Sequence, residues 1–155
     1  MTAMIYFGEM LIAPLLAIVL LAISPLKMTS VLELFVAGAV VWTFAEYVFH
    51  RFVFHNLMVR EHGLHHAKPK DPVRQILWQI WVCFALVYLI AGGVFLAGAL
   101  VAYAWYLFVH HCAHHGPDNL PLSLLTHHQT HHRFASRNYG VSTTLWDHIF
   151  GTMLR

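Results

Sequence analysis

Charged side chains are scarce in this sequence. Asp, Glu, Lys and Arg make up 10% of the residues, whereas an average soluble domain has about 25%. Hydrophobic residues account for 59%, and the mean hydropathy is +0.61. This composition argues against an ordinary soluble domain and predicts a membrane protein. The formal net charge of +2 is too small and too dispersed for a nucleic-acid-binding surface, so no nucleic-acid partner is expected.

Cysteine is also rare. The two cysteines, Cys83 and Cys112, lie within or beside apolar runs, and they are too few for a disulfide framework or an iron–sulfur cluster. We expect both to be small buried side chains. The sequence contains neither a GxGxxG nucleotide-binding fingerprint nor a CxxCH haem-attachment motif. Any redox chemistry would therefore need electrons from another protein.

Long apolar runs predict an all-α membrane fold. Met10–Leu26 and Val31–Phe49 each approach the length of a membrane-spanning helix. Ile76–Val109 has 34 residues without a charge, and as one helix it would be about 51 Å long, well beyond a hydrocarbon core of roughly 30 Å. We predict that it folds back at Ala91–Gly93, where paired glycines weaken the helix, into two crossings or a re-entrant hairpin. The prediction is a single domain, residues 1–155, containing an integral membrane four-helix unit.

Histidine is the abundant polar residue. The sequence has 14 histidines, and most fall in two clusters, residues 50–66 and 110–132, that each follow an apolar run. An even number of crossings between the clusters brings both to the same membrane face. Eight of the nine Lys and Arg residues lie in the segments that carry histidine, so this face and both termini are predicted to be cytoplasmic by the positive-inside rule. The polar tail Arg133–Arg155 is expected to belong to a cytosolic cap over the histidines.

The spacing of the histidines predicts metal binding. His62, His65 and His66 stand at positions i, i+3 and i+4, so they project from one face of a helix. The same spacing recurs within residues 128–132. Two such triads can hold two metal ions.

Two further histidine pairs have other spacings. His110 and His114 are one helical turn apart. His50 and His55 differ by about 140° around an ideal helix, so they can share a face only if the helix ends or widens between them. Imidazole ligands suit zinc or iron; the competing interpretation is a row of solvated histidines at the membrane interface. Surface roles, or hydrogen bonds to the ligands, are expected for the remaining histidines: His111, His115, His127 and His148.

Short boxes around these histidines resemble those of the membrane fatty acid hydroxylase and sterol desaturase superfamily. Flanking residues add to the resemblance, because Glu46-Tyr47, Asn138–Gly140 and Leu145–Thr152 are similar to the branch that hydroxylates fatty acyl chains of sphingolipids at the 2-position. The resemblance extends over residues 46–152. The boxes are HRFVFH at 50–55, HGLHH at 62–66, HHCAH at 110–114 and HQTHH at 128–132.

The resemblance implies a four-helix membrane unit with a cytosolic catalytic cap. It also implies a centre of two metal ions, with iron preferred and zinc as the alternative. This chain shows no fused cytochrome b5-like domain, which some larger members carry, and its loop Gly116–Leu125 is short. The electron donor is therefore expected to be a separate cytochrome b5, ferredoxin or reductase. The implied metal ligands are His50, His55, His62, His65, His66, His110, His114, His128, His131 and His132.

A hydrocarbon chain has no acidic, basic or electrophilic group with which a side chain could react. Its oxidation therefore requires O2 and a redox metal. We therefore predict a membrane oxygenase that hydroxylates a lipid acyl chain, with O2 as co-substrate and a diiron centre. Because an all-histidine shell carries no negative charge, Glu46, Asp118 and Asp147 are candidates to accept imidazole N–H groups. The competing roles are interfacial solvation for Glu46 and a turn interaction for Asp147. Glu9 is expected near the lipid headgroups.

Other functional classes stay open. The same chemistry serves sterol or carotenoid hydroxylases and desaturases. A non-redox zinc enzyme or a structural zinc site would use the same ligand type. A membrane protein that binds or moves metal or haem without catalysis is a further class, although a transport path would place ionisable groups at mid-membrane.

Overall fold

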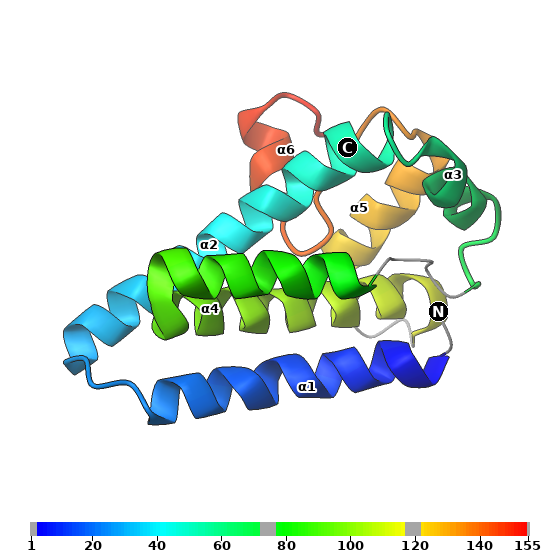
Figure 1. The fold of residues 1–155 in the computed structure, drawn as a ribbon. Helices are drawn as coiled ribbons and strands as arrows, with labels where there is room; N and C mark the ends of the chain where they lie inside the picture. The colour runs from blue at the N-terminus through cyan, green and yellow to red at the C-terminus, as the bar shows by residue number, and fades with distance from the viewer. Residues whose placement is uncertain (1–2, 72–76, 117–121, 155) are drawn as a thin grey trace. The chain divides into compact units, whose positions relative to one another are not determined.

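The computed structural model describes residues 3–71, 77–116 and 122–154, and within these ranges the chain is helical and contains no strand, which confirms the all-α prediction (Figure 1). The chain divides into two compact units. Met1–Trp42 and Arg74–Ala104 form the first, here called the helical unit. Thr43–Val73 and Trp105–Arg155 form the second, called the histidine unit because all 14 histidines belong to it.

Helices α1 (Ala3–Ala22) and α2 (Met28–Val48) begin the chain. The first ends before the predicted Leu26, because Pro25 disfavours helical geometry at Ser24 and has no N–H of its own. The hydroxyl of Ser24 instead accepts the Leu26 N–H at 3.3 Å. The second helix begins three residues before the predicted Val31.

Helix α4 (Leu77–His115) reverses direction inside the helical unit. Gly92 has φ 82° and ψ 173°, a conformation that glycine adopts without steric cost and that interrupts the helix. The break predicted at Ala91–Gly93 is thereby confirmed. The Phe84 and Tyr103 rings, one on each limb, lie 5.3 Å apart between centroids, as expected for limbs that fold back on each other (Figure 1).

Two helical stretches, Met28–Phe54 and Trp78–His115, are long and apolar enough to cross a membrane, and Phe7–Ala22 is a shorter apolar helix. These stretches agree with the prediction of a membrane protein. Cys112 is buried as expected, whereas Cys83 is exposed on α4, contrary to the prediction.

Glycine permits the helices of this unit to approach closely. A Cβ atom on Gly38 would lie 1.9 Å from the carbonyl oxygen of Phe95, and one on Gly98 would lie 1.9 Å from that of Phe35. Neither position has room for a side chain, so α2 meets the second limb of α4 backbone to backbone. Small residues support such contacts between membrane helices generally.

Glu9 joins α1 to both limbs of α4. Its side chain is 6% exposed, and its carboxylate accepts the indole N–H of Trp81 at 2.7 Å and the hydroxyl of Tyr103 at 2.6 Å. A buried carboxylate is costly unless it is hydrogen-bonded. Glu9 is therefore an internal contact of the helical unit, and its place near the lipid headgroups stays a prediction.

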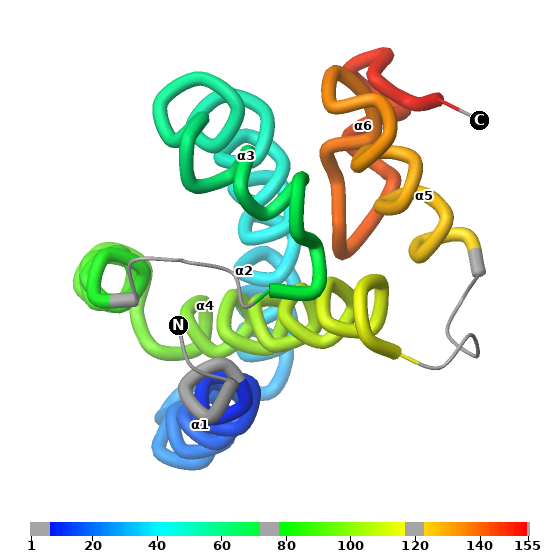
Figure 2. The backbone as a smooth tube through the Cα atoms, turned by 90° about the vertical axis from the view of Figure 1, so that its right-hand side faces the viewer, coloured from blue at the N-terminus to red at the C-terminus, as the bar shows by residue number. Residues whose placement is uncertain are grey.

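The histidine unit contains the π-helical segment η1 (Phe49–Phe54), α3 (Val59–Ala67), α5 (Leu122–Arg133) and α6 (Leu145–Ile149), with the last residues of α2 and α4. After α5 the chain returns past that helix to α6, orange to red in Figure 2. Asn138 in this return has φ 55°, a left-handed conformation that Asn tolerates. The return brings the tail beside residues that lie far away in the sequence.

We expect Gly98→Ala to lower the unfolding temperature of the protein in detergent. The added methyl group must displace the Phe35 carbonyl or the helix that carries it, and overpacking of this kind costs about 1–3 kcal/mol. The matched control is Gly8→Ala, since a Cβ there meets nothing within 4 Å and alanine favours helix more than glycine does. Equal unfolding temperatures for the two variants would contradict the close helix contact.

Candidate metal centre

The π-helical segment η1 positions the first two site histidines. The regular helix α2 ends at Val48, and the wider turn that follows puts His50 and His55 on a common side, with ring centroids 5.2 Å apart. In a π-helix hydrogen bonds span five residues instead of four, so positions i and i+5 come into line. The requirement that this helix end or widen between the two histidines is confirmed.

Ten histidines gather in two groups of five within the histidine unit. In each group one ring nitrogen from every histidine lies within 4.8 Å of the others. All ten residues of the predicted ligand set are brought together, and none of the other four histidines is in either group. The first group is His50, His55, His62, His66 and His131. The second group is His65, His110, His114, His128 and His132.

Each predicted triad is shared between the groups. On α3, His62 and His66 belong to the first group and His65 to the second. At about 100° per residue, position i+4 lies about 40° from position i, whereas i+3 lies about 60° away on the opposite side. A single helix can therefore serve two adjacent groups. Helix α5 does the same with the groups exchanged: His128 and His132 belong to the second group, and His131 to the first.

The Nε2 atoms of each group converge at short range. In the first group, His62 Nε2 lies 3.1 Å from that of His50, 3.1 Å from that of His55 and 3.0 Å from that of His66. In the second group, His128 Nε2 lies 3.0 Å from His114 Nε2 and 3.1 Å from His132 Nε2. Each group thus surrounds one point with nitrogen atoms.

Two main-chain carbonyls establish which ring nitrogen carries the proton. Nδ1 of His50 lies 2.5 Å from the Tyr139 carbonyl oxygen, and Nδ1 of His131 lies 2.7 Å from that of Arg137. A carbonyl only accepts hydrogen bonds, so both Nδ1 atoms must donate, and both Nε2 atoms carry lone pairs. The His131 lone pair lies 3.1 Å from Nε2 of His55 and of His66. A cation bound between these rings would accept such lone pairs.

The nitrogen separations fit a bound metal ion. With metal–nitrogen bonds of about 2.0–2.1 Å, two nitrogens at a right angle lie about 2.9 Å apart and two at the tetrahedral angle about 3.3 Å apart. Neighbouring Nε2 atoms in the groups lie 3.0–3.1 Å apart. Neutral imidazole is a ligand for iron, zinc, copper and nickel. The donor set therefore fits two transition-metal ions and does not by itself choose the element.

Burial keeps the site histidines neutral. Burial, with repulsion from neighbouring imidazoles as the smaller cause, lowers the pKa of His55 and His65 from 6.5 to about 4. The same causes lower the pKa of His62 to about 2. A metal ligand must be deprotonated. The rings are therefore in their ligand form at neutral pH before any metal binds.

Glu46 contacts the tail rather than an imidazole. Among the described residues, its carboxylate accepts the backbone N–H of Val141 at 2.6 Å, the backbone N–H of Ser142 at 3.2 Å and the Ser142 hydroxyl. The side chain is buried. Neither of the two roles considered for Glu46 from the sequence describes these contacts, since it neither bonds an imidazole nor lies in solvent.

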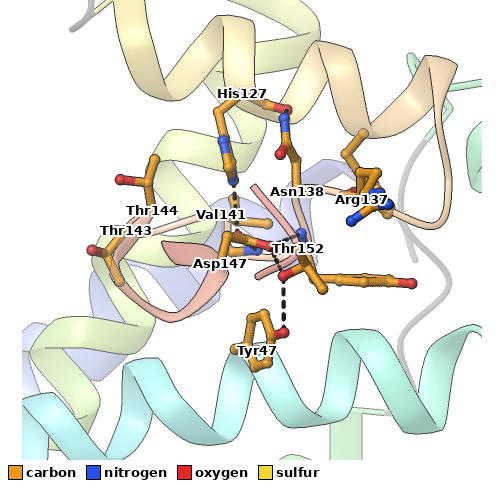
Figure 3. A network of polar contacts seen from close by, with 12 residues as sticks. Tyr47, His127, Arg137, Asn138, Val141, Thr143, Thr144, Asp147 and Thr152 are labelled. Atoms are coloured by element: carbon orange, nitrogen blue, oxygen red, sulfur yellow. Dashed lines mark hydrogen bonds and ion pairs between the residues drawn. The ribbon is translucent and has the colours of Figure 1, made fainter. Parts of the chain in front are cut away.

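Asp147 combines a turn interaction with an imidazole contact. It is fully buried and accepts the backbone N–H groups of Tyr139 at 2.9 Å and Gly140 at 2.7 Å. Its other partners are the Thr152 hydroxyl at 2.6 Å and His127 Nε2 at 2.9 Å (Figure 3). Burial alone would raise the pKa of Asp147, but these bonds outweigh it and lower the pKa below its usual value.

The imidazole bound by Asp147 is therefore not one of the ten grouped histidines. Asp118, the third candidate carboxylate, lies outside the described residues. Of the other ungrouped histidines, His111 and His115 stack on each other at 4.9 Å, and exposed His148 directs Nδ1 at the Thr144 carbonyl at 2.9 Å.

Sequence reasoning missed the carbonyl oxygens of Arg137 and Tyr139. No side-chain type marks a main-chain acceptor, so the ligand boxes gave no sign of them. The one available signal was Asn138 followed by Gly140, because Asn and Gly favour turns and left-handed backbone. A turn there exposes carbonyls to a neighbouring element.

We expect the metal-free protein to lose thermal stability as the pH falls from about 6.5 toward about 4. The pKa of His55 and His65 is about 4 in the folded chain and about 6.5 in the unfolded chain. Within that interval the unfolded chain binds more protons, so acid favours unfolding, and this contribution to stability is complete only above about pH 6.5. Unfolding temperatures measured with chelator across the interval test this. An unfolding temperature that stays constant over it would contradict neutral buried rings.

Comparison with known proteins agrees with this geometry. Residues 35–152 match the family described as fatty acid hydroxylase. Fatty acid 2-hydroxylase of Mus musculus is 33% identical over an alignment of 146 residues, and the match covers 78% of this chain and 39% of that protein. Dihydroceramide fatty acyl 2-hydroxylase FAH1 of Arabidopsis thaliana is 28% identical over an alignment of 149 residues, and the match covers 82% of this chain and 63% of that protein. The chain thus spans well under half of the length of the mouse relative.

A solved structure described as full-length scs7p, with only the hydroxylase domain visible, has the same fold. Its TM-score with this chain is 0.76 at 27% identity, and the match covers 93% of this chain and 63% of that chain. The family match alone covers more than half of the present sequence. The chain belongs to the fatty acid hydroxylase family.

Proposed function

We propose that this protein is a membrane oxygenase that hydroxylates a C–H bond in the acyl chain of a lipid. The observation that carries the proposal is the pair of adjacent groups of five imidazoles in a member of the fatty acid hydroxylase family. Several of its relatives are named as fatty acid or dihydroceramide fatty acyl 2-hydroxylases. We therefore propose the 2-position of a fatty acyl chain as the site of attack.

The ten grouped histidines would hold two metal ions, for which we propose iron. When bound, two redox-active ions supply the capacity to activate O2, which no side chain of the protein has. The overall change is RH + O2 + 2e⁻ + 2H⁺ → ROH + H2O. One oxygen atom of O2 is inserted into the C–H bond, and the other is released as water.

The protein's own contribution is position and exclusion of water. His50, His128 and His131 are 4%, 1% and 0% exposed, so their rings cannot turn out to solvent. The Tyr139 and Arg137 carbonyls hold His50 and His131 in the tautomer that aims a lone pair at the centre. Hydrogen bonds of this type fix ring orientation and raise ligand basicity. Exclusion of water from a site also protects reactive species from side reactions.

We further propose that the helical unit is embedded in the membrane as a four-helix unit and that the histidine unit caps it on the cytoplasmic side. The support is the distribution of Lys and Arg along the sequence. The chain would then take its substrate from the bilayer, where lipid acyl chains are concentrated.

The two electrons would come from a separate cytochrome b5, ferredoxin or reductase. The candidate docking patch contains Arg60, Lys68, Lys70 and Arg74, of which the first three are exposed and Arg74 lies outside the described residues. Exposed Glu61 and Asp71 lie in the same stretch, so residues 60–71 carry a net charge of +1. Such a stretch suits an acidic electron carrier, since charge complementarity speeds association. Attraction to anionic lipid would use the same charges.

Expression of the protein with a competent electron donor should add 16 mass units to one class of cellular lipid. His65→Ala should abolish the shift, because His65 belongs to the second metal group. His148→Ala is the matched control and should leave the shift intact, since His148 is exposed and outside both groups. Lipid mass spectrometry with fragmentation would locate the hydroxyl, expected at carbon 2. An unchanged lipid profile in the presence of the donor would refute the hydroxylase.

Protein purified without chelator should contain two metal ions per chain, and iron in cells that have sufficient iron. Elemental analysis by mass spectrometry measures both quantities. Two zinc ions per chain in iron-replete cells would instead support a zinc protein, because imidazole binds zinc equally well. One ion per chain in every preparation would contradict the two-group centre.

A further inference from the structure

The two metal groups differ in how their rings are held. The backbone segment Arg137–Ser142, here called the carbonyl loop, provides the acceptors for Nδ1 of His50 and Nδ1 of His131. Both of these histidines belong to the first group. Nδ1 of His65 and of His128 is buried and has no hydrogen-bond partner among the described residues; both histidines belong to the second group.

Two buried carboxylates hold the carbonyl loop by its amides. Asp147 accepts the N–H groups of Tyr139 and Gly140, and Glu46 accepts those of Val141 and Ser142. Four consecutive amides are thereby fixed from two directions. Because the plane of each peptide bond is rigid, a fixed Gly140 N–H also fixes the Tyr139 carbonyl that faces His50.

The adjoining residues complete the fixation. Asn138 donates its backbone N–H to the Thr152 carbonyl at 3.0 Å, and its side chain bonds both polar groups of the Leu154 backbone, at 2.6 and 3.1 Å. A fixed Asn138 N–H holds the Arg137 carbonyl, which faces His131, through the same planar bond. A Cβ atom on Gly140 would lie 2.2 Å from the Thr143 carbonyl oxygen and 3.0 Å from an Asp147 carboxylate oxygen. Position 140 therefore has no room for a side chain.

We propose that Glu46 and Asp147 are positioning residues that make the first metal position the tighter of the two. They act through the carbonyl loop, which fixes the tautomer and direction of two of the five ligands of that position. The second position receives no such support from this loop. The inference rests on the proposed two-metal centre and adds that its two positions are inequivalent.

Release of zinc to a chromophoric chelator tests the proposal without any measurement of enzyme activity. The protein is loaded with zinc, and the absorbance of 4-(2-pyridylazo)resorcinol is followed after mixing. Wild type should release one zinc ion fast and one slowly. His131→Ala should remove the slow phase and His132→Ala the fast phase, which assigns the phases to the first and second positions.

Asp147→Asn should accelerate the slow phase about 10–100-fold, the usual effect of losing an outer hydrogen bond at a metal site, and leave the fast phase unchanged. In Asp147→Asn an NH2 group replaces one carboxylate oxygen. This group is a hydrogen-bond donor, so it cannot accept the backbone N–H groups that the oxygen accepted. Glu46→Gln and Gly140→Ala should act in the same direction. The three substitutions perturb the carbonyl loop at different positions, so if one variant fails to fold, the other two still test the proposal. Circular dichroism identifies the variants that fold.

Tyr47→Phe is the matched control. It removes the 3.0 Å bond between the Tyr47 and Thr152 hydroxyls, which belongs to the same buried network, but touches none of the loop amides (Figure 3). Both phases should keep their wild-type rates. Two zinc ions released at one rate, or equal acceleration of both phases in the loop variants, would overturn the inference alone. Binding of fewer than two zinc ions by wild type would overturn the two-metal centre as well.

Discussion

The histidine unit depends on one electrostatic feature: the ring nitrogens of ten imidazoles converge in two groups, each of which could hold a metal ion. Neighbouring Nε2 atoms approach to 3.0–3.1 Å, and for His50 and His131 the hydrogen bonds at Nδ1 leave Nε2 no proton with which to bond its neighbour. A bound cation would accept these lone pairs. The fold supplies the rings from four helical elements, η1 with its C-cap residue His55, α3, α4 and α5. The metal ions we propose would add an attraction that favours the arrangement.

Local helix geometry accounts for most of this arrangement, and for that reason the sequence was sufficient to predict it. Spacings of three and four residues placed His62, His65 and His66 on one helix, and a spacing of five at His50 and His55 required the distortion found in η1. Spacing alone could not allocate the rings to the two groups. That allocation depends on which way each helix is turned toward its neighbours, which is a property of the packed unit.

The contacts of the carboxylates could not be predicted, because they join residues far apart in the sequence. Glu46 meets Val141 and Ser142 across about a hundred residues, and Glu9 meets Trp81 and Tyr103 over a similar distance. Proximity to histidine in the sequence suggested a direct bond from Glu46 to an imidazole. In the structure the Glu46 carboxylate instead bonds backbone N–H groups of the carbonyl loop, and the Tyr139 carbonyl of that loop contacts the His50 ring.

X-ray absorption spectroscopy of the purified, metal-loaded protein is the most direct test of the centre itself. The absorption edge identifies the element, and the fine structure reports the atoms bound to it. Our account predicts iron with a first shell dominated by nitrogen at about 2.1 Å, together with the outer-shell scattering typical of imidazole rings. A first shell of sulfur, or one made mainly of carboxylate oxygen without imidazole scattering, would contradict it.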